Sequence, residues 1–450
     1  MEDVLFTLVV LMVGMLVHQL VLRRYDQPFE RRLLSRSFGL HVASSFGLIL
    51  VYQYYYNGSG DMFGYLHFGV PITEALRSDF ETVAPQLWAL FVHADYTLPI
   101  ESLGLGSTGT MQAVSCVLFY FLGNSIFASA LVISIGAYVA KVLVYEAMRP
   151  EFEKSEHEQV LFALSLSPTA IVWSCALLKE PVLMCALGPV FLSLRWILDG
   201  RRVALATTLL AACSVVVVLI KPYVLIAVGL GAGAWMFSKT MRSRGNLLIK
   251  PVYVAVAGAL VILGFAAASA VLPSLSPDQV ADSIQMQRRV SSKEVGGSNF
   301  YLEDADAPTD ELPERGIISQ IRLVPLALVT ALFRPVLFES FSALQFLNSL
   351  EMAWLSLMFY QVVRRNSWQG LLQRVMTNPA LIFCASFCLV LALGTGLSTA
   401  NLGTLSRYRA PMMPFFLLLL VTLRERQPRA QQPATLPATR HPAVLNKLPT

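Results

Sequence analysis

The stretch RRVALATTLLAACSVVVVLIKP, residues 201–222, decides the fold class of this chain. Its middle part, residues 203–220, carries no charged side chain, and Arg201, Arg202 and Lys221 flank it on the two sides. A helix needs roughly 20 apolar residues to cross a bilayer, and it satisfies its backbone hydrogen bonds within the segment. The stretch therefore predicts a membrane-spanning helix with charged residues at both ends.

The rest of the chain repeats this pattern of apolar runs separated by short charged segments. Of its 450 residues, 55% are hydrophobic and only 14% are charged, whereas soluble domains carry about 25% charged residues. Further apolar runs lie at 3–22, 37–55, 111–147, 160–177, 181–198, 222–238, 250–271, 341–363, 379–398 and 410–423. We predict an all-α, polytopic integral membrane protein with about 10–12 transmembrane helices.

Three segments need separate treatment. Residues 111–147 are too long for one straight crossing, which favours a re-entrant piece followed by a helix. Residues 318–335 contain two arginines and two prolines, so we do not expect this segment to cross alone. The run at 3–22 lacks a basic region before it and a small-residue cleavage site after it, so we expect a retained helix.

Clusters of arginine and lysine alternate with the apolar runs and predict the orientation, because such residues concentrate in cytoplasmic loops. The clusters lie at residues 23–36, 201–202, 239–250, 364–374 and 424–426. The acid-rich loops 57–110 and 272–317 are then external. We expect residues 1–426 to form one polytopic membrane domain. Residues 427–450, rich in Pro, Gln, Ala and Thr, should form a disordered cytoplasmic tail.

Charge, motifs and cysteines exclude several classes of function. The net charge of +5 is spread over short clusters between apolar runs, so it does not indicate nucleic-acid binding. The sequence contains no Walker or glycine-rich nucleotide loop, which argues against an ATP-driven machine. All six cysteines fall inside apolar runs, where they are expected to be small buried side chains. The sequence HADY at residues 93–96 offers too few ligands to predict a metal site.

Charged residues at the predicted external ends of the helices are the candidate functional groups. Asp61 follows an apolar run, in the stretch YYYNGSGDMFGYLHFG of residues 54–69. Ionisable groups at membrane depth are costly and commonly mark a site or a pathway. The other candidates at this end are Lys179, Glu180, Lys221, Arg334, Glu339, Glu351, Arg407 and Arg409, with Tyr65 and His67 next to Asp61.

These residue types suit a lipid-linked phosphate sugar. Arginine and lysine bind phosphate or diphosphate through charge-assisted hydrogen bonds, and a neighbouring carboxylate can take the proton of a sugar hydroxyl. Each residue also has a structural alternative: the start of a helix for Asp61, a turn for Lys179 and Glu180, and an interfacial anchor for Lys221 and the arginines. The alternative for His67 is packing at the interface.

Several short motifs resemble those of known membrane enzymes. The sequence GDMFGYLHFG, residues 60–69, resembles the first external loop of GT-C glycosyltransferases, which use polyisoprenyl-phosphate sugars. The sequence RYRAPMMPFFLLLL, residues 407–420, is similar to the Arg-x-x-x-Pro start of a helix in bacterial members of that superfamily. LLKEP at 177–181 and the pair FRPVLFES and LNSLE, residues 333–340 and 347–351, resemble segments of membrane proteins of bacterial polysaccharide assembly.

The resemblance implies a fold and roles for the candidate residues. Asp61 would be the catalytic base, and Tyr65, His67, Glu180 and Glu339 would support the site. Lys179, Lys221, Arg334, Arg407 and Arg409 would contact the carrier phosphate. The loop 57–110 would hold two juxtamembrane helices, near 66–77 and 80–93. The family often carries a second acid next to the first, but Met62 follows Asp61 here. A divalent metal therefore stays possible, and no other cofactor is expected.

Three functions are open from the sequence. The first is a glycosyltransferase of the bacterial inner membrane, which moves a sugar from polyprenyl phosphate to a glycan or lipid during surface polysaccharide biosynthesis. The second is an O-antigen or exopolysaccharide polymerase or ligase, for which the basic residues in loop 272–317 would suit an acceptor glycan. The third is a glycan or lipid translocator, which predicts polar residues in the helix middles. The expected partners are a polyprenyl-linked sugar and membrane lipid.

Overall fold

The computed structural model describes residues 2–97, 104, 106–242, 299–300, 321–340 and 342–424. Every regular element among these residues is a helix, apart from an isolated β-bridge between Asn299 and Asn401. The expected all-α class is thereby confirmed for this part of the chain. The predicted span 250–271, the loop 272–317 and the tail 427–450 lie outside the described residues.

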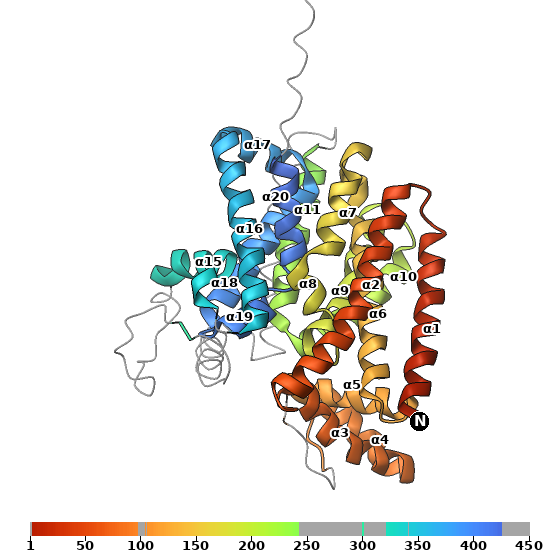
Figure 1. The fold of residues 1–450 in the computed structure, drawn as a ribbon. Coiled ribbons are helices and arrows are strands. Elements are labelled where there is room, and N and C mark those ends of the chain that lie inside the picture. The colour runs from red at the N-terminus through yellow and green to blue at the C-terminus, as the bar shows by residue number, and fades with distance from the viewer. Residues whose placement is uncertain are drawn as a thin grey trace, which may run out of the picture.

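The first half of the chain forms a run of helices on one side of Figure 1. They are α1 (Glu2–Leu22), α2 (Pro28–Leu50) with a π-helical end (Val51–Tyr55), α3 (Asp61–Ser78), α4 (Phe80–Val92), α5 (Ser107–Phe121), α6 (Ile126–Met148), α7 (His157–Leu166), α8 (Pro168–Val172), α9 (Lys179–Leu198), α10 (Val203–Ile220) and α11 (Pro222–Arg242). Short 3₁₀ turns at Arg149–Glu151 and Lys154–Glu156 connect α6 to α7.

The second half supplies the remaining helices. They are α15 (Val324–Phe333), α16 (Ala343–Arg365), α17 (Trp368–Thr377), α18 (Pro379–Ser398), α19 (Leu402–Tyr408) and α20 (Met413–Arg424). Short 3₁₀ turns precede α15 at Ile321–Leu323 and α16 at Leu337–Glu339. Figure 1 shows this half beside the first, with α20 and α11 toward the middle of the molecule.

Six helical segments in the described residues are long and apolar enough to cross a membrane. They are Glu2–Leu22, Pro28–Tyr55, Ile126–Glu151, Lys179–Leu198, Val203–Ile220 and Pro379–Ser398. The protein is therefore a multi-pass, all-helical membrane protein. Its exact number of crossings stays a prediction, because part of the chain lies outside the described residues.

Glycine, asparagine and proline residues divide the long apolar runs into shorter helices. The run 111–147 divides into α5 and α6 at a turn where Gly123 and Asn124 both adopt positive φ. The described part of the segment 318–335 contains a 3₁₀ turn and the ten-residue α15, which is too short to cross a membrane. The run 160–177 breaks between α7 and α8 because Pro168 has no backbone N–H and disfavours helix before it.

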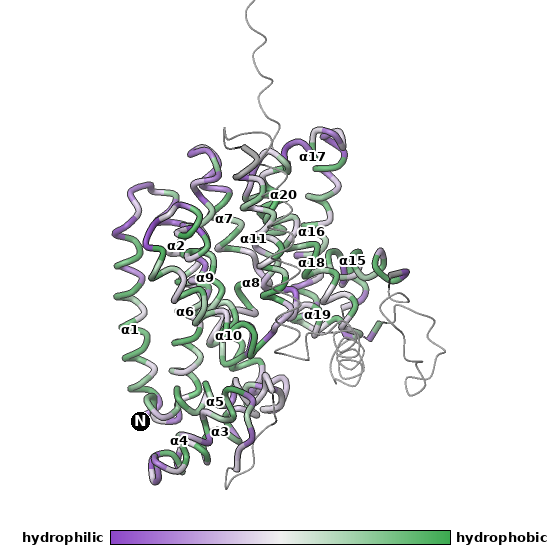
Figure 2. Tube along the Cα trace, turned by 180° about the vertical axis from the view of Figure 1, so that it is seen from behind, coloured by the Kyte–Doolittle hydropathy of each residue, from purple (hydrophilic) through white to green (hydrophobic). Residues whose placement is uncertain are grey.

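The juxtamembrane helices lie where the first external loop was expected. Helices α3 and α4 cover residues 61–78 and 80–92, close to the predicted 66–77 and 80–93. Figure 1 shows α3, α4 and α5 gathered at the end of the molecule where α1 begins, and α17 at the opposite end. Figure 2 shows hydrophobic residues along the middle of the long helices and hydrophilic segments toward both ends. This distribution is typical of a protein that spans a bilayer.

The core lies around α6, which packs closely against α9. A Cβ on Gly188 of α9 would stand 2.4 Å from the Cα of Ala140 in α6, so only glycine permits this approach. By contrast, α1 exposes a broad apolar face that includes Leu5, Met12 and Leu16. Such a face suits contact with lipid tails, whereas α6 is enclosed by other helices.

Candidate functional site

Arg407 is the centre of a charged network formed by four separate segments. Its Nη2 atom lies 2.5 Å from Asp61 Oδ2, and its Nε atom lies 2.9 Å from Glu180 Oε2. The second oxygen of Glu180 accepts a hydrogen bond from Lys221 Nζ at 2.7 Å. The Lys221 ammonium also lies 3.8 Å from the centre of the Tyr408 ring, where a cation–π interaction holds it.

The chain before Asp61 turns sharply so that this acid begins α3 at the mouth of the bundle. Gly58 and Gly60 have positive φ, and a Cβ on Gly60 would stand 2.7 Å from the Tyr52 ring. Only glycine fits such a position without strain. Asp61 then occupies the first turn of α3, where the helix dipole favours a negative charge. Asp61 therefore begins a helix, as its structural interpretation predicted, and the same position is open to a functional role.

Glu180 lies at the start of α9, and Arg407 lies at the end of the short helix α19. Glu180 lies in the first turn of α9, which follows the fully buried Leu177 and Leu178 in the chain. Arg407 lies in the last turn of α19. The side chain of Asn401 caps α19 by accepting hydrogen bonds from Gly403 N at 2.8 Å and from Thr404 N at 3.3 Å. This cap fixes the start of α19, the helix that carries Arg407.

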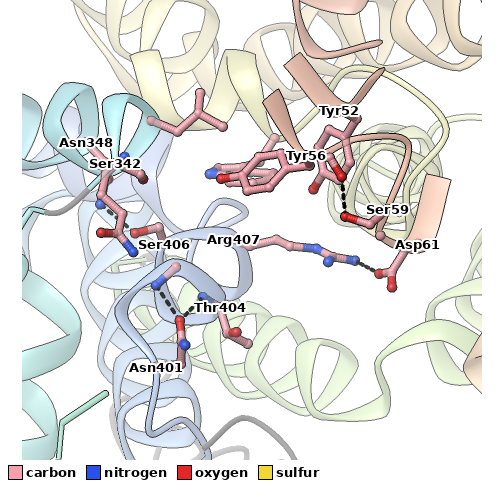
Figure 3. A pocket seen from close by; sticks show the side chains of 15 residues that line it. Tyr52, Tyr56, Ser59, Asp61, Ser342, Asn348, Asn401, Thr404, Ser406 and Arg407 are labelled. Carbon is pink, nitrogen blue, oxygen red and sulfur yellow. Dashed lines mark hydrogen bonds and ion pairs between the residues drawn. The ribbon is translucent and has the colours of Figure 1, made fainter. Parts of the chain in front are cut away.

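Asp61 and Arg407 form part of the wall of a cavity of about 320 Å³. The other lining residues are mostly uncharged hydrogen-bonding or aromatic groups, namely Tyr52, Tyr56, Ser59, Gly60, Trp173, Ser342, Leu344, Gln345, Asn348, Asn401, Gly403, Thr404 and Ser406. Figure 3 shows Arg407 reaching from α19 toward Asp61. On one side lie Ser342, Asn348, Asn401, Thr404 and Ser406, and on the other lie Tyr52, Tyr56 and Ser59. Hence the cavity combines one ion pair with many neutral polar groups.

A second, more open depression lies on another side of Asp61. Its lining includes Gly64, Phe68, His67 and Thr108. His67 is exposed there. Asp61 thus borders two spaces that a ligand can reach from different directions.

Charge and burial shift the pKa values of Asp61 and Lys221. The Arg407 guanidinium holds the pKa of Asp61 below its usual range, against the opposite effect of burial. Burial lowers the pKa of Lys221 to about 8, although the neighbouring Glu180 acts in the other direction. Asp61 is therefore ionised at neutral pH, and the network holds two acids against Arg407 and Lys221.

Lys179, Arg334 and Glu339 lie outside the cavity wall and have contacts of their own. Lys179 Nζ donates hydrogen bonds to Thr108 Oγ1 at 2.8 Å and to Ser107 Oγ at 3.3 Å. Arg334 forms an ion pair with Glu339, five residues further along the chain. Neither of these two residues lines the cavity around Arg407.

Arg409 and Tyr65 are enclosed by protein. The Arg409 side chain donates to the carbonyl oxygens of Ala331 and Arg334 and to Asn348 Oδ1, and the residue has 0% exposure. The phosphate contact expected for Arg409 has no open path to this guanidinium. Tyr65 is also fully buried, beneath the first turn of α3, and its hydroxyl has no hydrogen-bond partner among the described residues.

Sequence reasoning missed the neutral half of the cavity. Gln345 and Asn348 come from the first two turns of α16, and Asn401 and Ser406 come from α19 or its cap. Amides that interrupt the start of an apolar helix are the signal that could have found them, as in LQFLNSLE of residues 344–351. Tyr52 and Tyr56 gave a clearer signal, because they lie in the aromatic run just before Asp61.

The donor set gives no metal centre within the described part of the chain. No group of three or more His, Cys, Asp or Glu side chains there is arranged to hold a metal ion. Asp61 and Glu180 each bind Arg407 instead.

Comparisons with known proteins do not assign the chain to a family. No family model matches it, and neither a curated protein nor a solved structure shows significant similarity to it. The geometry of the site therefore carries the functional assignment.

Proposed function

We propose that the protein is a membrane glycosyltransferase of the GT-C type that transfers a sugar from a polyprenyl-phosphate carrier to a glycan or lipid acceptor. The observation that carries this proposal is the pairing of Asp61 with Arg407 on the wall of a cavity lined by amides, hydroxyls and aromatic rings. Its place would be the extracytoplasmic face of a bacterial inner membrane, in surface polysaccharide biosynthesis.

The cavity suits a sugar. Its volume of about 320 Å³ falls within the range of small-molecule sites, roughly 300–1,000 Å³. Amide and hydroxyl groups such as Asn348, Asn401 and Ser406 can exchange hydrogen bonds with sugar hydroxyls. The rings of Tyr52 and Trp173 offer apolar faces for the C–H groups of a pyranose. The lining thus favours an uncharged, hydroxyl-rich ligand next to a cation.

Arg407 and Asp61 can supply the two functions that the transfer requires. Arg407 would bind the carrier phosphate, whose negative charge increases as the bond to the anomeric carbon breaks. The acceptor hydroxyl would form the new bond to that carbon while Asp61 takes its proton. The phosphate leaves with the electron pair of the broken C–O bond. No separate acid is needed, since a phosphate monoester is a stable leaving group.

A transfer assay tests this function. The purified full-length protein is incubated with radiolabelled polyprenyl-phosphate sugars and extracted membrane glycolipids, and labelled product is measured. Replacing Asp61→Asn should lower the rate by about 10²–10⁴-fold, which is the usual contribution of a general base. Glu74→Gln is the matched control, because Glu74 is an exposed acid of the same helix outside the cavity. Full transfer by Asp61→Asn would rule out Asp61 as the base.

A translocator is the second candidate, and ionisable groups buried between the helices favour it. His41 in α2, Lys141 in α6 and Glu351 in α16 are all buried. Lys141 Nζ donates to the carbonyl of Ala170 at 3.0 Å, and Glu351 accepts from Thr169 N at 2.7 Å, so both bind the short helix α8. Ionisable groups at such depth commonly line a transport path. Transport of a labelled lipid-linked sugar across vesicles without product formation would favour this candidate.

A further inference from the structure

The two carboxylates that hold Arg407 differ sharply in their surroundings. The side chain of Glu180 has 0% exposure, while that of Asp61 has 41%. Glu180 binds two cations, Arg407 and Lys221, through its two oxygens. Asp61 binds Arg407 alone, through one oxygen, at the border of the cavity. Of the two carboxylates that bind Arg407, that of Asp61 is therefore the one that a ligand can displace.

The charge balance of the network decides whether an anion can bind Arg407. The carboxylates of Asp61 and Glu180 balance the positive charges of the two cations that they pair with, Arg407 and Lys221. A buried cation keeps a partner because an uncompensated charge at low dielectric is costly. An incoming anion can therefore bind Arg407 strongly only when one carboxylate releases it. The exposed ion pair is the weaker competitor, since solvent screens it.

We propose that Asp61 occupies the place of a phosphate group in the resting protein, and that phosphate binding transfers Arg407 Nη2 from Asp61 to the ligand. This inference rests on the proposed function and names the event that prepares the site. Glu180 is a positioning residue that keeps hold of Arg407 Nε during the exchange. Phosphate is the stronger acceptor because it carries more charge and more acceptor oxygens than a carboxylate.

The exchange links the base to the presence of the carrier. While Arg407 binds Asp61, one oxygen of the carboxylate is engaged and the neighbouring guanidinium keeps the basicity of the group low. Once the phosphate takes Arg407, Asp61 is free to accept the proton of an acceptor hydroxyl. Phosphate binding thus places Arg407 on the leaving group and frees Asp61 as the base at the same time. Without a carrier phosphate in the cavity, the base stays occupied.

A binding experiment without turnover tests the exchange. The full-length protein is purified in detergent, and the dissociation constants of farnesyl phosphate and of inorganic phosphate are measured by titration calorimetry. Asp61→Asn should bind farnesyl phosphate at least about threefold more tightly than the wild type, because the competing ion pair is gone. Arg407→Ala should lose this binding, and Glu74→Gln should bind like the wild type. Thermal unfolding of each variant verifies that it is folded.

The two probes distinguish the sources of the phosphate. A larger affinity for farnesyl phosphate than for inorganic phosphate, with the same gain in Asp61→Asn, supports exchange on a lipid carrier. An equal affinity supports exchange on free phosphate. Weaker or unchanged binding by Asp61→Asn overturns the inference, because Asp61 would then not compete for Arg407.

The outcomes also separate this inference from the proposed function. If Asp61→Asn binds farnesyl phosphate more tightly and the wild type transfers no sugar, the exchange stands and the transferase proposal fails. If Asp61→Asn stops transfer without any gain in phosphate affinity, the transferase stands and the exchange fails.

Discussion

Arg407 and Arg409 lie two residues apart in the chain, yet their surroundings are opposite. Arg407 binds two carboxylates and reaches the wall of the cavity. Arg409 binds the carbonyl oxygens of Ala331 and Arg334 and the amide oxygen of Asn348, with no exposure. The first arginine holds anions that a ligand can replace, whereas the second joins α15, α16 and α19 into one unit. The same residue type therefore serves a site in one case and the fold in the other.

The largest effect on stability should come from Glu180→Gln, which removes the negative charge that Arg407 and Lys221 share. Glu180 is fully buried and compensates both Arg407 and Lys221. Removing one partner of a buried ion pair costs about 3–5 kcal/mol, because the remaining charge is left uncompensated. Thermal unfolding of the purified protein should show a marked drop. A melting temperature equal to that of the wild type would mean that Glu180 does not stabilise Arg407 and Lys221.

Replacing Arg409→Met should also destabilise the protein, by about 2–4 kcal/mol. Methionine leaves the carbonyls of Ala331 and Arg334 without their donor in a buried place, and each unsatisfied group costs about 1–3 kcal/mol. Binding of farnesyl phosphate by the folded fraction should stay close to wild type. Lost binding in a fully stable variant would instead place Arg409 in the ligand site, which would break the comparison.

Asp61→Asn should change stability by less than about 1 kcal/mol, because its ion pair with Arg407 is partly exposed. The same variant should show the large loss of transfer described above. This separation of activity from stability is the signature of a functional acid. A collapse in protein level or melting temperature would assign Asp61 a structural role.

The smallest effect concerns the titration of Asp61. Arg407 and Lys179 lower the pKa of Asp61, while burial and Glu180 raise it. A carbodiimide modifies only the protonated acid, so labelling of Asp61 in the wild type should begin at a lower pH than in Arg407→Gln. Mass spectrometry of the peptide that contains Asp61 reads the two pH profiles. Coincident profiles would mean that Arg407 does not control this carboxyl.

The helical class and the charged half of the site follow from local sequence. Apolar runs such as 203–220 predict spans because lipid leaves the backbone no other partners. Asp61, Glu180, Lys221 and Arg407 were all predicted at one end of the helices, and the structure brings these four side chains into contact.

The difference between Arg407 and Arg409 could not be predicted, because it depends on tertiary packing. Neighbouring positions of one turn point in different directions, and only the placement of α3, α9 and α16 decides what each guanidinium meets. The amides of Gln345 and Asn348 are a similar case. Their helix α16 was predicted, but the face that it turns to the cavity depends on α19.

The most direct test of the central claim is a structure of the full-length protein with farnesyl phosphate bound. We expect the phosphate within hydrogen-bond distance of Arg407 Nη2, with Glu180 still bound to Nε and the Asp61 carboxylate released toward the cavity. A phosphate bound elsewhere, or one bound while the ion pair between Arg407 and Asp61 stays intact, would contradict it.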